Sequence, residues 1–384
     1  MNFLLPANNT HIPIVPNYET IKLQNNNNSS NINNSNSISN NNIYILDSLY
    51  IYYYNIKSHI IKLCNEIKLQ KDNNISGFEN IIKIVNPYEY MYTVVPNTKH
   101  MVSKLQITDK LYYNFLEITN SINLFENYNC CPLNSLYIAN SEIDIGNINR
   151  LIKNINNIYY FKNIDDVKLT NDTFDFIFLD INNENDNINL YVVNLIKTLI
   201  IIHSYQSTHG ISIIKINHMF HKQIVDILFL LSTYFENVFI IKPDTCNIIT
   251  FEKYIVCKSF IYNDSNITEK IKLINILHNY ENDKTKNIIS LIENEIPCYF
   301  INKLNEINII IGHQQLEACN QIINILKNKN KEDKIENITK INIQKCINMC
   351  EKFKIPYNNL FEKNNIFLPP SANTHCSNLI NMCL

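Results

Sequence analysis

Short apolar runs alternate with longer amphipathic stretches over residues 134–260. The apolar runs predict β-strands at 135–139, 158–161, 174–181, 210–216, 237–243 and 253–260. Apolar residues spaced three and four positions apart predict helices over 188–205 and 221–235. Strands that alternate with helices in this way indicate an α/β fold, with a mostly parallel sheet covered on both faces.

The last two predicted strands, 237–243 and 253–260, are joined by a short link. Parallel neighbours need a long crossover, usually a helix, whereas antiparallel neighbours need only a turn or a loop. We therefore expect these two strands to form an antiparallel hairpin that ends the sheet.

The regions on either side of this block differ in character. We expect an N-terminal segment at 1–45, an aromatic and helical subdomain at 46–100, the α/β domain at 101–262 and a helical C-terminal region at 263–384. The stretch Gln24 to Asn42 is almost entirely Asn and Ser, so it is expected to be disordered. In the C-terminal region, apolar residues recur at helical spacing in two long segments.

Composition excludes some classes of protein. With 46% hydrophobic residues in 384, the chain can bury a sizeable core, and a formal net charge of -2 argues against coating nucleic acid through bulk charge. No apolar run approaches the roughly 18 residues needed to span a bilayer, and we see no secretory signal, so we expect an intracellular protein with no membrane association. The 11 cysteines contain no CxxC pair, which favours reduced core cysteines over zinc or disulfides. Only 4 glycines and a single arginine, Arg150, suggest an AT-rich genome.

Three ionisable residues stand at predicted strand ends. Asp180 ends one strand, Lys215 stands near the end of the next, and Glu252 precedes the last. Reactive groups of open α/β sheets lie at such ends, where the loops converge. Each residue alone fits a helix cap or a surface charge, but together they indicate a functional site.

The second half of the α/β block resembles a known family. The segment GISIIKINHMF is followed by FENVFIIKPDTCNIITFEKYIVCKSF, which contains Lys242-Pro243, an Asn-containing loop and the Glu-x-Tyr of Glu252 and Tyr254. This is similar to FtsJ-like ribose 2′-O-methyltransferases, and more narrowly to Adrift-type cap methyltransferases and the FtsJ-like enzymes of African swine fever virus and related large DNA viruses. The resemblance covers roughly residues 174–260. It implies a Rossmann-like S-adenosylmethionine methyltransferase sheet that ends in a hairpin.

The family uses a Lys-Asp-Lys-Glu tetrad to methylate a ribose hydroxyl. The resemblance assigns the Asp to Asp180, the second Lys to Lys215 and the Glu to Glu252. A lysine amine can accept the hydroxyl proton, and the carboxylates can orient the amine and the ribose. For S-adenosylmethionine, the resemblance implies binding residues at the ends of the first strands, namely Ala139, Asn140, Ser141, Asp165 and Asp180.

The sequence departs from the family pattern at two places. Asn114 stands where the first tetrad Lys belongs, and Lys110, one turn earlier on the same helix face, is the candidate to replace it. After Ala139, the chain continues as Asn140-Ser141-Glu142 and lacks the family's glycine-rich turn. Two hypotheses stay open: an active mRNA cap 2′-O-methyltransferase, and a degenerate homologue that serves as an RNA-binding or assembly subunit.

The resemblance also implies partners and a location. The partners would be capped mRNA and the capping or transcription machinery, and the location would be host cytoplasm, or the virion, if the protein is viral. An RNA groove would rest on lysines, with Lys104, Lys110, Lys242, Lys253 and Lys258 as candidates, and Tyr112 or Tyr113 could stack a base. Ordinary surface charge is the alternative reading of these lysines.

Overall fold

A computed structural model of the chain gives its fold. It describes residues 1–8, 10, 12–20, 43–70, 78–128, 132–139, 145–152, 155–167, 172–180, 187–261, 265–284, 286–327 and 331–359. The predicted disorder of Gln24 to Asn42 lies outside these residues.

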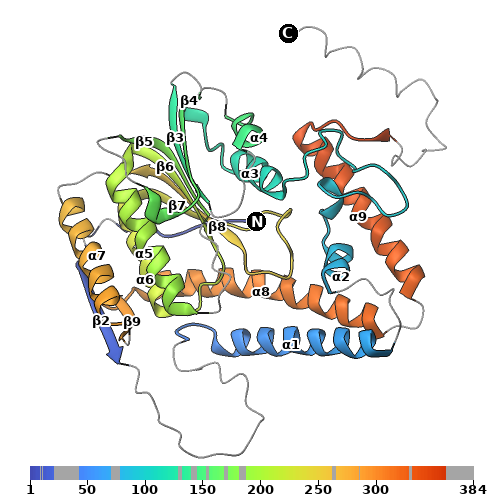
Figure 1. Cartoon of the computed structure of the whole chain (residues 1–384), viewed down its shortest axis with the longest axis horizontal. Coiled ribbons are helices and arrows are strands. Elements are labelled where there is room, and N and C mark those ends of the chain that lie inside the picture. Colours follow the sequence, from blue (N-terminus) through green and yellow to red (C-terminus); the bar gives the residue numbers. More distant parts are fainter. Residues whose placement is uncertain are drawn as a thin grey trace, which may run out of the picture.

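A seven-stranded sheet forms the centre of the molecule, in the order β1-β7-β8-β6-β5-β3-β4 (Figure 1). Its strands are β1 (Asn2–Leu4), β3 (Leu133–Ala139), β4 (Ile155–Phe161), β5 (Phe174–Asp180), β6 (Gln206–Ile216), β7 (Phe235–Ile241) and β8 (Lys253–Phe260). The pairs β4–β3, β3–β5 and β5–β6 are parallel, whereas β6–β8, β8–β7 and β7–β1 are antiparallel. The predicted α/β fold and the antiparallel hairpin of β7 and β8 are therefore confirmed. The prediction that this hairpin ends the sheet is wrong, because β1 pairs with the outer edge of β7. The sheet is mixed, because β8 inserts between β6 and β7.

Helices cover both faces of this sheet. The long helices are α1 (Asp47–Gln70), α2 (Phe78–Val85), α3 (Lys110–Ser121), α5 (Ile188–Tyr205), α6 (Lys222–Tyr234), α7 (Ser265–Asn282), α8 (Cys298–Lys327) and α9 (Lys331–Phe353), with a short α4 (Ile145–Asn149) after β3. Three single turns of 3-10 helix are η2 (Glu89–Met91), η3 (Glu126–Tyr128) and η4 (Ile164–Asp166).

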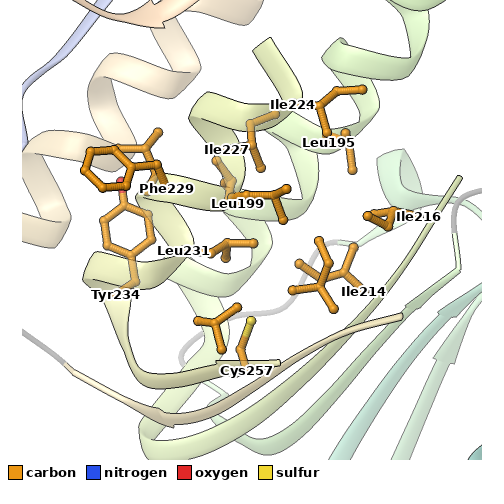
Figure 2. Close-up of a cluster of buried hydrophobic side chains, with 14 of the residues drawn as sticks. Leu195, Leu199, Ile214, Ile216, Ile224, Ile227, Phe229, Leu231, Tyr234 and Cys257 are labelled. Carbon is orange, nitrogen blue, oxygen red and sulfur yellow. The ribbon is translucent and has the colours of Figure 1, made fainter. Parts of the chain in front are cut away.

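Alternate side chains of each strand enter different cores, as the twofold period of a strand requires. Ile214 and Ile216 of β6 pack with Leu195 and Leu199 of α5 and with α6, as Figure 2 shows. On the other face, Phe176 and Phe178 of β5 pack with Phe115 of α3. We call these the α5–α6 face and the α3 face.

The sequence led us to expect no apolar segment long enough to span a membrane, and the helix α5 departs from that expectation. Among the described residues, it is the helix that is long and apolar enough to cross a membrane, with 56% of its 18 residues buried. It packs against β6, α6 and α7, and its side chains belong to the core of the α5–α6 face. Its place in that core accounts for its apolar composition.

The flanking regions contain strands that the sequence pattern did not predict. Besides β1, a strand β2 (Ile14–Thr20) pairs with β9 (Lys286–Ile292), which interrupts an otherwise helical C-terminal region. The helix α1 packs along α8, and α2 packs against α8 and α9 (Figure 1). The predicted domain boundaries stay a prediction, and helix packing crosses them.

The described cysteines follow the expectation of reduced, mostly internal thiols. The cysteines Cys64, Cys246, Cys257, Cys319, Cys346 and Cys350 are buried and Cys298 is exposed, each as a thiol outside any disulfide.

Candidate active site

The ends of three strands and the start of one helix meet at one edge of the sheet. Asp180 ends β5, Lys215 lies near the end of β6, and Glu252 immediately precedes β8. Because β6 and β8 are antiparallel, with Lys215 opposite Tyr254, the start of β8 adjoins the end of β6. The first turn of α3, which begins at Lys110 after the N-cap Asp109, covers the same edge.

Two ion pairs join these four residues. Lys215 Nζ lies 2.9 Å from Asp180 Oδ2, and Lys110 Nζ lies 3.0 Å from Glu252 Oε2. The carboxylates are the more buried partners, with side chains 4% and 12% exposed, respectively. The structure thus brings together all four residues that the sequence named as catalytic candidates, Lys110 included.

The electrostatics make the two pairs one cluster. Burial alone would raise the pKa of Glu252, but the charges of Lys110 and Lys215 outweigh it and lower that pKa to about 2. Burial raises the pKa of Asp180, and the opposing attraction of Lys215 does not fully offset it. Burial disfavours the Lys110 ammonium, but Glu252 reverses this and leaves its pKa raised. The two lysines and the two carboxylates of the site therefore interact electrostatically as one group.

A buried hydrogen-bond chain lies behind Glu252. Thr245 Oγ1 donates to Asn114 Oδ1 at 2.6 Å, Asn114 Nδ2 donates to the Tyr254 hydroxyl at 3.0 Å, and that hydroxyl donates to Glu252 Oε1 at 3.2 Å. Sequence reasoning noted Asn114 only as a missing lysine and gave Tyr254 no role. The Glu-x-Tyr spacing is the signal that could have revealed it, because alternate residues of a strand share a face.

The helix α3 holds the connection between β7 and β8 at several points. Besides the contacts of Lys110 and Asn114, Glu117 accepts hydrogen bonds from the Asp244 backbone N–H at 3.0 and 2.8 Å. These helix residues are spaced four and three apart, so they share one face. Burial and the nearby Asp244 raise the pKa of Glu117 to about 7. The connection that carries Glu252 is therefore fixed to the helix that carries Lys110.

The predicted cofactor residues are only partly described. Ala139 is buried at the end of β3, directly opposite Asp180 in the sheet register, whereas Asn140 and Ser141 lie outside the described residues. Asp165 follows β4 in η4 and is 2.7 Å from Lys197 of α5. Asp180 Oδ1 is buried and has no hydrogen-bond partner among the described residues.

Most of the residues that were predicted to form an RNA groove are not placed to contact RNA, so the prediction is wrong for them. Lys242 is 5% exposed and Lys253 0%, so neither can contact a nucleic acid. Tyr112 and Tyr113 are buried and cannot stack a base without a rearrangement. Lys258 lies toward the other end of β8 from Glu252, opposite Ile211. Lys104 remains exposed and donates to Asn359.

No family model and no curated protein matches this chain. Among the residues that the structure describes, no group of three or more His, Cys, Asp or Glu side chains could hold a metal ion.

Proposed function

We propose that the protein is an S-adenosylmethionine-dependent RNA 2′-O-methyltransferase that acts on the cap of mRNA. The observation that carries this proposal is the convergence of Lys110, Asp180, Lys215 and Glu252 in two partly buried ion pairs. Three of these positions, Asp180, Lys215 and Glu252, match the family motif, and Lys110 stands one helical turn from the position of the missing lysine. An α/β sheet that contains an antiparallel hairpin after its parallel strands is also the arrangement expected of a Rossmann-like methyltransferase.

The residues present fit a bound cofactor at the end of β5. Asp180 Oδ1 is a buried acceptor without a partner among the described residues, and such an atom costs about 1–3 kcal/mol. A hydrogen-bond donor on a bound molecule would recover that cost. When bound, S-adenosylmethionine supplies a methyl group activated by its attachment to a positive sulfur. Asp180 would hold the cofactor, and Ala139 opposite it, which is buried, would border the site.

The four polar side chains would serve the acceptor hydroxyl. The hydroxyl oxygen would take the methyl group that the cofactor supplies, and the cofactor sulfur would keep the electron pair of the broken bond. The hydroxyl proton would pass to Lys215 after its amine has released to solvent the proton that it shares with Asp180 in the ion pair. Asp180 fixes the position of that amine through the contact at 2.9 Å. Lys110 and Glu252 would orient the ribose, since holding reactants in line supplies much of the acceleration.

Two measurements on the full chain test the proposal. Binding of radiolabelled S-adenosylmethionine is measured first, and transfer of label to a capped RNA second. We expect the wild-type protein to bind S-adenosylmethionine and to transfer the label to the RNA. Lys215→Met should still bind S-adenosylmethionine but should no longer transfer the label. Lys340→Met, a lysine on α9 with a 64% exposed side chain, is the matched control and should transfer at the wild-type rate.

Folded protein that binds no S-adenosylmethionine would refute the enzyme reading and leave the degenerate homologue. The presence of Lys110 beside Glu252 favours the enzyme, because the ammonium missing at Asn114 is supplied one turn away. Transfer to an uncapped RNA alone would keep the chemistry and reject the cap as substrate.

A further inference from the structure

The carboxylate of Glu252 is held at both of its oxygens by different elements. Oε2 accepts from Lys110 of α3, and Oε1 accepts from the hydroxyl of Tyr254, two residues further along on β8. The thiol of Cys246, 3.8 Å from Oε1, is the other contact that the described residues make with this oxygen. The rotation of the carboxylate about its last bond is therefore set by Lys110 and Tyr254 together.

The direction of each proton in the chain behind Oε1 follows from chemistry. With a pKa lowered to about 2 by Lys110 and Lys215 against the effect of burial, Glu252 is ionised and can only accept. Tyr254 has a single hydroxyl proton, which must then point to Glu252. Asn114 must present its amide N–H₂ to the tyrosine oxygen, and its carbonyl oxygen is left for the hydroxyl of Thr245.

Within the part of the chain that the structure describes, these buried side chains hydrogen-bond to one another and to Glu252. Asn114, Thr245 and Tyr254 are each 0% exposed, so water does not compete for their polar atoms. The backbone of Tyr254 is anchored in the middle of the sheet, opposite Lys215 on one side and Ile241 on the other. The orientation of Glu252 is thereby tied to a rigid strand and a rigid helix.

We propose that Asn114 and Tyr254 are positioning residues that orient the Glu252 carboxylate toward Lys110 and the acceptor. Asn114 polarises the tyrosine hydroxyl, and Tyr254 transmits this to Glu252. The kinetic part of this inference rests on the proposed methyltransferase function, whereas the part concerning Glu252 itself does not.

The decisive variant is Tyr254→Phe, which removes the hydroxyl and keeps the ring. The matched control is Tyr137→Phe on β3. This tyrosine is also 0% exposed on the α3 face, but its hydroxyl donates to Asn149 and does not contact Glu252. The first readout is the titration of Glu252 by carbon NMR of protein labelled at glutamate carboxyls, with assignment from Glu252→Gln. The second is the kcat and KM of methyl transfer.

A hydrogen bond to an ionised carboxylate favours the charged form. We therefore expect Tyr254→Phe to raise the pKa of Glu252 by about one unit, and Asn114→Leu to raise it by less. For transfer, we expect kcat to fall about 10- to 100-fold, with the KM for S-adenosylmethionine within about twofold of wild type. Tyr137→Phe should leave both the titration and the kinetics unchanged.

Two results overturn the positioning role. One is a Glu252 titration in Tyr254→Phe that is identical to that of wild type, and the other is an equal effect of Tyr137→Phe. If the wild-type protein transfers no methyl group, the proposed function fails, while the titration still decides whether Tyr254 and Asn114 position Glu252.

Discussion

Two groups of basic side chains occupy the same strand ends but lie on opposite faces of the sheet. On the α3 face, Lys110 and Lys215 pair with carboxylates. On the α5–α6 face, Lys253 lies near His218, whose ring centroid is 4.9 Å from that of His221, and Lys253 Nζ donates to the backbone carbonyl of Asn217. We call His218, His221 and Lys253 the buried basic cluster.

The lysines of the two groups differ in their partners: Lys110 pairs with a carboxylate, whereas Lys253 donates to a backbone carbonyl. Burial lowers the pKa of Lys253 well below its usual range, and nearby Lys242 adds to this effect. Burial acts on Lys110 in the same direction, but Glu252 more than compensates, and its pKa is raised. Glu252 and Lys253 are adjacent in sequence, so strand geometry sends one to each face. A one-residue step thus separates a carboxylate paired with a lysine from a lysine whose pKa is lowered by burial.

The largest expected difference is in activity, between Lys215→Met and Lys253→Met. Loss of a general base typically costs about 10²- to 10⁴-fold in rate, so Lys215→Met should transfer methyl groups at least about 100-fold more slowly. Among the described residues, no carboxylate pairs with the buried Lys253, and Lys253→Met replaces this lysine by an apolar chain of similar length. It should stay within a few-fold of wild type in the transfer assay. Equal losses in the two variants would show that pairing does not separate the two groups.

A smaller effect is expected on stability when the second ion pair is broken. Lys110→Met leaves the Glu252 charge buried without its main partner, which should lower the free energy of unfolding by about 3 kcal/mol. Adding Glu252→Gln removes that charge, so the double variant should recover much of the loss. Urea denaturation of the four proteins gives the coupling energy. Additive effects would mean that the pair contributes nothing to stability.

The buried basic cluster predicts loss of stability in acid. Burial lowers the pKa of His221 to about 4, and burial together with His221 and Lys253 lowers that of His218 to about 3. Because the unfolded chain binds these protons near pH 6.5, the stability is complete above that pH and is lost as pH falls toward 4. For His221 alone the loss is about 2 kcal/mol at pH 5.

Denaturation at pH 7.5 and pH 5 measures this loss, and His221→Phe should reduce it. If His221→Phe shows the same acid loss as wild type, the ring is protonated in the folded protein.

The sequence predicts the residues of the candidate site on the α3 face better than those of the buried basic cluster on the α5–α6 face. Strand-end positions identified Asp180, Lys215 and Glu252, because a strand and its end can be recognised from a local apolar run. Lys253 was mistaken for a groove lysine, since its burial depends on helices that pack from elsewhere in the chain. The pairing of β2 with β9 was missed for the same reason: its partners are distant and each strand is short. Asn114 shows the limit most clearly, because its role depends on contacts with Thr245 and Tyr254.

The smallest effect is expected where a lysine–carboxylate pair stands in solvent. On α9, Lys340 Nζ lies 2.6 Å from Glu336 Oε1, a contact as close as those of the site, but the side chains are 64% and 65% exposed. In solvent the attraction is screened, and holding two long side chains in place costs conformational entropy. Lys340→Ala should therefore leave the unfolding midpoint unchanged within error, in the same assay in which Lys110→Met lowers it. A comparable loss in both variants would mean that contact distance, and not burial, decides what such a pair contributes in this protein.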